Sequence, residues 1–209
     1  AWTLTSEGLI DASGQLLQEL EPGLEVVAET IHVADGTRLD SVYLEAESIT
    51  IGDVTWQGEN RLDAVELNIV GAQTAHSGAS LHLTPGSDHA EISLGHSVPG
   101  VGFGLDTEEL ARLAEAGLAQ LTIGSDRGSH QFTIDGLAYD GDLTLQAPVG
   151  DGSFEVLSEV LHRGGTLEYV GTGSTQSTSA DTLTDGVPIE IDDSLELVYD
   201  VSNGNIIRM

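Results

Sequence analysis

The chain has 209 residues, with thirty-five acidic side chains against six basic ones, so its formal net charge at pH 7 is −29. All six basic residues are arginines, and lysine is absent. Such a negative surface repels nucleic-acid phosphates and anionic lipid headgroups, which excludes nucleic acid and acidic membranes as expected partners. Because the chain has no cysteine, disulfides, thiolate metal sites and cysteine nucleophiles are excluded as well.

Short segments that alternate apolar and polar residues recur along the chain and predict β-strands. Eight of them have the form apolar-x-apolar, and they begin at Ile31, Ile49, Leu67, Leu81, Leu121, Leu143, Leu167 and Leu195. Second alternating strands lie between them, at residues 42–44, 92–94, 132–134, 154–156 and 187–191. Six of the seven intervals between the eight first residues are 14 to 28 residues long, which is close to the roughly 20 to 30 residues of a solenoid coil.

Strands this short cannot bury an apolar face alone, whereas stacking one coil on the next buries the face and pairs the backbone groups. The pattern therefore predicts an all-β parallel β-helix, or solenoid. A sandwich of the immunoglobulin type is the alternative, because it also has many short strands. The scarcity of tryptophan, which occurs only as Trp2 and Trp56, and the glycine that follows several segments favour the solenoid.

One interval, from Leu81 to Leu121, is 40 residues long and predicts an inserted helix. Asp106-Thr-Glu-Glu109 resembles a capping box, and apolar residues then recur at helical spacing. We expect one amphipathic helix over residues 106–120, lying laterally against the solenoid with Leu110, Leu113 and Ala114 inward and Arg112 and Glu115 outward. Residues 99–104 are a predicted flexible lead-in, and the low-complexity residues 171–180 a predicted protruding loop.

We expect a single solenoid segment over residues 1–209, a fragment of a larger surface protein. The opening AWTLTSEGLI lacks the charged n-region of a signal peptide, and the end NGNIIRM lacks the composition of a tail. No stretch approaches the roughly 18 apolar residues of a membrane span, so no membrane insertion is expected.

The middle of the chain resembles the repeat region of filamentous-haemagglutinin-like secreted adhesins of the two-partner-secretion type. The residues that carry the resemblance are Glu108-Glu-Leu110-Ala-Arg112-Leu113, then Leu118-Ala-Gln-Leu121-Thr-Ile123-Gly124, Phe132-Thr-Ile134 and Leu143-Thr-Leu145. The match is best over residues 81–169, and the Asn-Pro-Asn-Gly motif of the family's secretion domain is absent. The resemblance implies a right-handed parallel β-helix that is secreted or displayed on a bacterial cell surface, with a structural and binding role and no catalytic residue.

Two sets of residues are candidates for binding. We expect Asp140-Gly-Asp142 and Asp151-Gly-Ser153 to lie one coil apart, which predicts a structural calcium ion held by Asp140, Asp142 and Asp151. Trp56 and Tyr139 lie near turns and could stack on a sugar ring if exposed, with packing in the core as the alternative.

Catalytic and zinc chemistry find little support in the sequence. The eliminating lyases with a β-helix fold use an arginine or lysine base beside calcium-binding acids, and no such cluster is recognisable here. Asp192-Asp193 is the only adjacent acid pair that suits a hydrolase, and a solvated turn is the alternative for it. His82, His89 and His96 are spaced by seven residues, which is not a usual zinc spacing.

The sequence thus predicts a non-catalytic structural and binding segment of an adhesin-like protein, a stiff acidic rod whose partner is a glycan, another surface polymer or a neighbouring protein module. We expect a monomer and no cofactor apart from calcium. A carbohydrate-active β-helix enzyme and a calcium-stabilised extracellular module are the alternatives. Acids at outward positions, such as Glu66, Glu168 and Glu196, indicate an acidic coat suited to a salt-rich setting.

Overall fold

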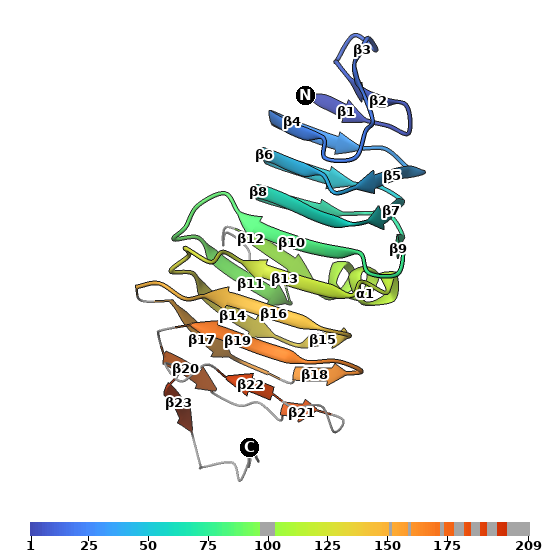
Figure 1. Ribbon diagram of the computed structural model, residues 1–209. Coiled ribbons are helices and arrows are strands. Elements are labelled where there is room, and N and C mark those ends of the chain that lie inside the picture. The colour runs from blue at the N-terminus through green and yellow to red at the C-terminus, as the bar shows by residue number, and fades with distance from the viewer. Residues whose placement is uncertain are drawn as a thin grey trace.

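The computed structural model describes residues 1–96, 103–150, 152–158 and 160–171, the side chain of Arg163 excepted, and the backbone of four strands beyond them. These residues form a β-solenoid of about seven turns, with mostly parallel sheets and one helix (Figure 1). The predicted fold class is therefore confirmed. The coils stack along one axis, so that strands one coil apart in the sequence lie side by side.

Face 1 of the solenoid is a sheet of eleven strands in the order β22-β19-β16-β13-β10-β8-β6-β4-β1-β2-β3. The strands are β1 (Trp2–Leu4), β2 (Gly8–Ile10), β3 (Leu16–Glu19), β4 (Glu25–Val33), β6 (Tyr43–Ile51), β8 (Glu59–Ile69), β10 (Ser80–Pro85), β13 (Gln120–Gly124), β16 (Leu143–Ala147), β19 (Leu167–Gly171) and β22 (Ile189–Ile191). Pairing is parallel from β1 to β22, whereas β2 and β3 pair antiparallel beyond β1. The antiparallel hairpin therefore covers the edge of the first coil, which would otherwise expose unpaired backbone groups.

Face 2 is a sheet of six strands in the order β12-β11-β14-β17-β20-β23. The strands are β11 (Glu91–Gly95), β12 (Phe103–Asp106), β14 (Gln131–Asp135), β17 (Ser153–Val156), β20 (Ser174–Ser177) and β23 (Glu196–Tyr199). Face 3 consists of two three-stranded sheets. They contain β5 (Thr37–Asp40), β7 (Val54–Gln57) and β9 (Gln73–Ala75), and β15 (Leu137–Asp140), β18 (Val160–Arg163) and β21 (Thr182–Thr184).

Helix α1 (Thr107–Ala116) lies between the two sheets of face 3 and packs against both β9 and β15 (Figure 1). The predicted capping box is confirmed, because Asp106 accepts from the amides of Glu108 and Glu109 while Glu109 accepts from the amide of Asp106. The expected extent of 106–120 is too long, since Gly117 ends the helix in the left-handed conformation. The helix lies laterally, as predicted, and takes the position of a face 3 strand in the wall of the solenoid.

The inward side of the helix agrees with the prediction at Leu110 and Leu113, which are fully buried. Ala114 is only partly buried, and Ala116 and Leu118 contribute to the core instead. The expected flexible lead-in is wrong at its end, because Phe103 and Gly104 pair with β11 as part of β12; residues 99–102 lie outside the described residues.

The strand registers explain the uneven intervals of the sequence. Ile31, Ile49 and Leu67 pair at steps of 18 residues, whereas Leu121, Leu143 and Leu167 pair at steps of 22 and 24. Leu81 pairs with Asn60 and not with Leu67, because β8 is long and its first half alone meets β10. The interval of 14 residues is therefore not a coil.

Two C-terminal expectations also need correction. The segment that begins at Leu195 does not follow the segment at Leu167 by one coil, because β23 pairs with β20 on face 2 and β22 is the strand that continues face 1. The predicted loop 171–180 contains β20, because strand pairing with β17 uses backbone groups and needs no apolar side chain. Residues 172–173 and 178–180 of that loop lie outside the described residues.

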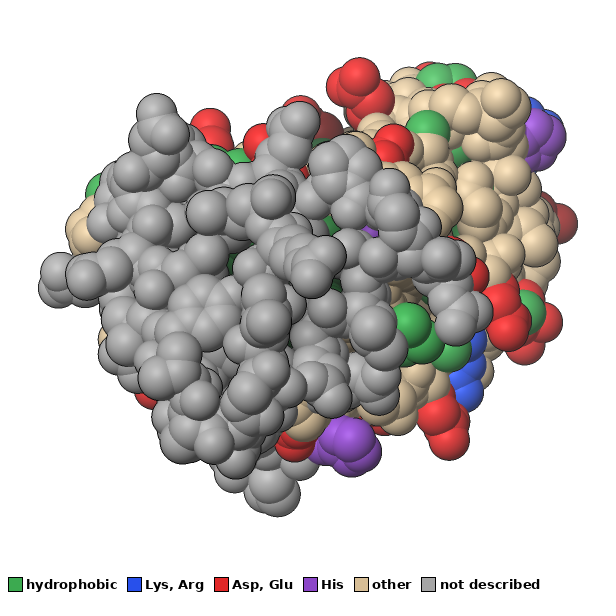
Figure 2. All heavy atoms as spheres, turned by 90° about the horizontal axis from the view of Figure 1, so that it is seen from below, with side chains coloured by type: hydrophobic (Ala, Val, Ile, Leu, Met, Phe, Trp, Pro, Cys, Tyr) green, Lys and Arg blue, Asp and Glu red, His purple; other side chains and the backbone are tan. Residues whose placement is uncertain are grey.

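The core runs through the solenoid as columns of apolar side chains from successive coils. Phe132 and Phe154 stack with ring centroids 4.8 Å apart, and Ile31 and Ile49 are both fully buried. Each buried side chain of this size contributes about 1.5–3 kcal/mol relative to an exposed one. On the surface seen in Figure 2, acidic side chains are spread over the described residues and basic ones are few.

Candidate functional site

An ordered array of six outward side chains lies on face 1, and we call it the polar patch. It has two columns that cross β6, β8 and β10 in register. The first column contains Tyr43, Arg61 and His82, and the second contains Glu45, Asp63 and Thr84. The residue between the two columns on each strand is a fully or almost fully buried leucine, namely Leu44, Leu62 or Leu83. Strand alternation therefore turns the six side chains away from the core, and of the six Thr84 is the one that is almost fully covered.

The side chains of the patch contact one another across the coils. The Tyr43 hydroxyl donates a hydrogen bond to Glu45 Oε2 at 2.7 Å. The Arg61 guanidinium lies 5.8 Å from the centroid of the Tyr43 ring, and its Nη2 is 3.9 Å from Asp63 Oδ2. The patch thus combines an aromatic ring, a guanidinium and two carboxylates at adjacent positions.

Two buried polar atoms of the patch have no hydrogen-bond partner within the part of the chain that the structure describes. They are Arg61 Nε and Thr84 Oγ1, and the Thr84 side chain is only 4% exposed. His82 Nε2 lies 2.8 Å from the carbonyl oxygen of Gly124. Because a carbonyl only accepts, Nε2 carries the proton and Nδ1 of the neutral ring is an acceptor.

Burial shifts the ionisation of three groups in the patch. It raises the pKa of Tyr43 to about 12, with a further contribution from the hydrogen bond to Glu45. Burial also raises the pKa of Asp63, against the opposing effect of Arg61, and lowers the pKa of His82. Perturbed groups that converge on one surface are a physical indication of a functional site.

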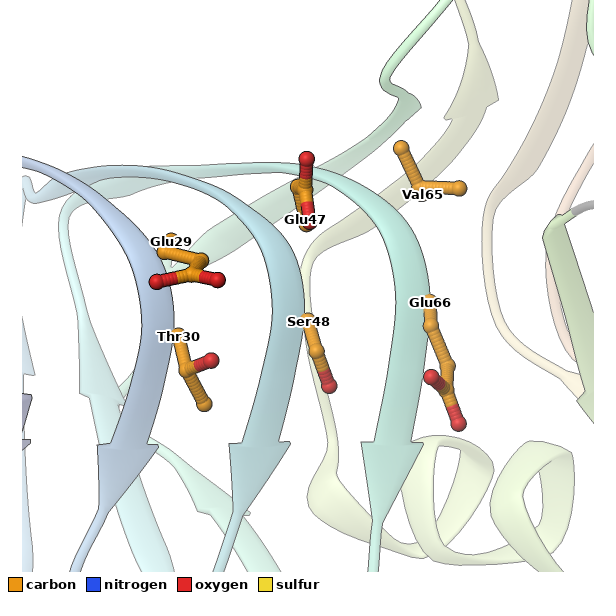
Figure 3. Close-up of a pocket in the computed structure, with 6 residues that line it drawn as sticks. All are labelled: Glu29, Thr30, Glu47, Ser48, Val65 and Glu66. Atoms are coloured by element: carbon orange, nitrogen blue, oxygen red, sulfur yellow. The ribbon is translucent and has the colours of Figure 1, made fainter. Parts of the chain in front are cut away.

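A second feature, the corner groove, lies beside the patch where β4, β6 and β8 bend (Figure 3). It has a volume of about 340 Å³ and is lined by Glu29, Thr30, Glu47, Ser48, Val65 and Glu66. Thr30, Ser48 and Glu66 pair in register across the three strands, and the side chain of Val65 is exposed. The groove adjoins the patch because Glu47 and Val65 lie two residues beyond Glu45 and Asp63 on the same strands.

The groove and the patch can bind polar ligands, because they offer carboxylate acceptors, hydroxyl groups, a guanidinium and one exposed apolar side chain. The volume of the groove falls at the lower end of the range of ligand pockets, about 300–1,000 Å³. Apart from His82, which is weighed and rejected above as a zinc ligand, none of the six patch residues is singled out as a binding residue from the sequence. The signal for them is the coil spacing, since Tyr43, Arg61 and His82 are 18 and 21 residues apart.

The strand register disagrees with the coil spacing on which the predicted calcium site depends. Asp140 and Asp142 precede β16, whereas Asp151 follows it and lies outside the described residues, so the two motifs flank one strand instead of lying one coil apart. Asp142 Oδ1 accepts a hydrogen bond from the amide of Thr166 at 2.7 Å, which gives it a structural role in the next turn. Among the described residues, no group of three or more histidine or acidic side chains is placed to hold a metal ion.

The predicted stacking roles of Trp56 and Tyr139 are wrong, because both side chains are buried, with exposed fractions of 0% and 2%. Each follows the apolar alternation of its strand, after Val54 on β7 and Leu137 on β15. Trp56 Nε1 donates to Gln73 Oε1 at 3.0 Å. Both rings therefore belong to the core, which was the alternative left open from the sequence.

The fold and the patch together define an acidic parallel β-solenoid that carries an ordered polar array on one face. Comparison with family models, with curated proteins and with solved structures finds no match to this chain. The resemblance to filamentous-haemagglutinin-like repeats therefore rests on the residues quoted for it. In the part of the chain that the structure describes, no helix has the length and apolar character needed to cross a membrane.

Proposed function

We propose that this chain is a structural and binding segment of a secreted or cell-surface bacterial protein of the adhesin type. It is a stiff acidic rod that acts by presenting contact surfaces to a glycan, a surface polymer or a neighbouring protein module, without catalysis. Secretion, surface display and the monomeric state are parts of this proposal, and so is the resemblance to filamentous-haemagglutinin-like repeats.

The observation that carries the proposal is the continuous parallel ladder of face 1 from β4 to β19. Each coil is hydrogen-bonded to the next, and one apolar core runs through all of them. Stability in such a solenoid comes from neighbouring coils, so the stack resists bending as one body. Helix α1 maintains this continuity because it packs against strands on both sides of its coil.

The outward surface supports the binding part of the proposal. Side chains on parallel strands repeat about 4.8 Å apart along the stack, so a column such as Tyr43, Arg61 and His82 can contact successive units of a long ligand. The acidic coat keeps such a rod soluble and discourages association between copies. Binding by several weak contacts is strengthened when many rods are displayed together.

Bead adhesion tests the proposal. Beads that carry the chain through a terminal tag would be incubated with immobilised neutral, amino and acidic polysaccharides and with intact bacterial and epithelial surfaces. We expect retention on at least one surface to exceed that of tag-only beads by about tenfold or more through multivalent contact. The same polymers would be assayed for newly released reducing ends, which should stay at background. Retention on none of the surfaces, or catalytic release of oligosaccharides, would contradict the proposal.

A further inference from the structure

The geometry points to a specific ligand class for the polar patch: we infer that the patch, together with the corner groove, binds a neutral oligosaccharide chain. The inference rests on the proposed function, since it assigns the contact surface of the rod and the chemistry of its partner. The residues that carry it are Arg61, Asp63, His82 and Thr84, with Tyr43 and Glu45 beside them.

Hydrogen-bonding capacity is the first argument. Arg61 has donors in excess of its single long ion pair with Asp63, while the carboxylates of Asp63 and Glu45 and Nδ1 of His82 are acceptors. A sugar hydroxyl both donates and accepts. Two neighbouring hydroxyls can therefore accept from the guanidinium and donate to a carboxylate at the same time, which one anion or one cation cannot do.

The two unpartnered atoms are the second argument. Buried polar groups in proteins nearly always have a hydrogen-bond partner, yet Arg61 Nε and Thr84 Oγ1 have none among the described residues. Both belong to adjacent strands, since Arg61 and Thr84 flank the in-register pair of Leu62 and Leu83. A donor and a hydroxyl without a partner on adjacent strands of one face are groups that a ligand able to both donate and accept would satisfy.

Charge selects among polar ligands. The net charge of −29 and the carboxylates of Glu29, Glu47 and Glu66 in the groove disfavour uronates, sulfated sugars and phosphates. A basic peptide suits the groove, but in the patch it would bring a cation against Arg61. A neutral ligand avoids both conflicts, and its hydroxyls can use the carboxylates as acceptors.

The arrangement along the strands indicates a chain of sugars. Glu45 and Glu47 are two residues apart on β6, which separates them by about 7 Å in an extended strand. A ligand that contacts both the patch and the groove must therefore span about 7 Å or more, which favours several linked sugars over a single one. Val65 is an exposed residue of the groove lining and can contact the apolar face of a sugar ring, while Thr30 and Ser48 offer hydroxyls.

Titration calorimetry on the full chain tests the inference. The probes are neutral hexasaccharides (cellohexaose, maltohexaose, mannohexaose and xylohexaose), hexagalacturonate as the anionic probe and hexa-arginine as the basic peptide. We expect saturable binding of at least one neutral probe, weakened about tenfold or more by Arg61→Gln and by Thr84→Val, because each removes a buried polar contact to the ligand. Arg38→Gln on face 3, whose guanidinium donates to Gln57, is the matched control and should bind as the wild type does.

Two variants keep the test decisive if one of them misfolds, and circular dichroism melts would establish which are folded. The inference is overturned if no neutral probe binds, if folded Arg61→Gln or Thr84→Val binds as tightly as Arg38→Gln, or if hexagalacturonate or hexa-arginine is preferred. The bead adhesion test distinguishes a wrong ligand assignment from a wrong proposed function. Retention without binding of a neutral probe would overturn the ligand assignment alone, whereas loss of retention would overturn both.

Discussion

The Glu109 side chain of helix α1 accepts a hydrogen bond from the backbone amide of Ile69, forty residues earlier, at 2.8 Å. Arg112 completes the contact, because its Nη1 donates to the carbonyl oxygen of Ile69 at 2.8 Å. Ile69 is the last residue of β8, beyond the half of the strand that pairs with β10. Two side chains of the helix therefore bind the backbone groups at this strand end, and they fix α1 in the wall of the solenoid.

The first expected outcome concerns this contact. Glu109→Ala should lower the free energy of unfolding by about 1–3 kcal/mol, because the amides of Ile69 and Asp106 both lose their acceptor. Chemical denaturation monitored by circular dichroism measures the change. Glu115→Ala, an exposed position on the same helix, is the control and should have a much smaller effect. Equal losses in the two variants would show that the contact contributes nothing.

A second outcome concerns pH and His130, which is fully buried. Its Nδ1 lies 3.3 Å from the carbonyl oxygen of Ala90, and its Nε2 has no partner among the described residues. Burial lowers the pKa of His130 below 6.5, against the opposing effects of the Ala90 carbonyl and Asp88. The folded state thus binds the proton less well than the unfolded state. The stability that neutral His130 contributes is present above pH 6.5 and is lost as the pH falls towards the lower folded pKa.

The difference in unfolding free energy between the wild type and His130→Gln should therefore shrink as the pH falls from 7 to 5, by at most about 1.4 kcal/mol per pH unit. Nuclear magnetic resonance should place the imidazole titration midpoint below 6.5, the ordinary value. Ile49→Val on face 1 is a fully buried core control without a titratable group, and its difference from the wild type should not change with pH. A midpoint at or above 6.5 would refute the expected direction.

Much of the fold could be predicted from the sequence because its signals are local. The capping box at Asp106 and Glu109 lies within four residues. The segments that begin at Leu121, Leu143 and Leu167 alternate apolar and polar residues, which is enough to predict them as strands. The polar patch could not be predicted in this way. Its columns depend on register between coils of unequal length, and a shift of one residue turns every side chain to the opposite face.

The failed binding predictions have a related cause. Trp56 and Tyr139 were judged by their closeness to turns, but alternation within β7 and β15 places both in the core. Asp142 and Asp151 were assumed to be one coil apart, whereas the partner of Asp142 in the next coil is Thr166. The number of residues between two motifs shows whether they lie one coil apart only when the face of each strand between them is known.

A third outcome concerns salt. Because the net charge is −29, added sodium chloride should raise the melting temperature as the screening length falls from about 10 Å at 0.1 M to about 3 Å at 1 M. Glu29 and Glu47 lie at corresponding positions of adjacent coils in the groove, and like charges placed in this way cost roughly 0.2–1 kcal/mol. The double variant Glu29→Gln, Glu47→Gln should therefore melt higher at low salt and respond less to added salt.

Differential scanning calorimetry across this salt range measures both effects. Glu7→Gln, an exposed position near the N-terminus, is the control for removing a carboxylate away from the groove, and it should change the salt response less than the double variant does. A melting temperature that does not depend on sodium chloride would contradict the view that repulsion within the acidic coat limits stability.

The last outcome concerns Gly124, the residue whose carbonyl oxygen is bound by His82. Its φ is +107°, and a Cβ at this position would lie 2.1 Å from the carbonyl oxygen of Gln146 on the next coil. Gly78 also has a positive φ, of +86°, but a Cβ there would meet nothing within 4 Å. Gly78→Ala should therefore cost only the backbone strain of about 1–2 kcal/mol, whereas Gly124→Ala must also displace β16. Denaturant unfolding should show the larger loss of unfolding free energy for Gly124→Ala. The His82 imidazole resonances should shift in that variant alone, because the carbonyl oxygen of residue 124 accepts the hydrogen bond from His82 and would move. Equal losses with unchanged His82 resonances would mean that the close approach of β13 to β16 is not what requires glycine at this position.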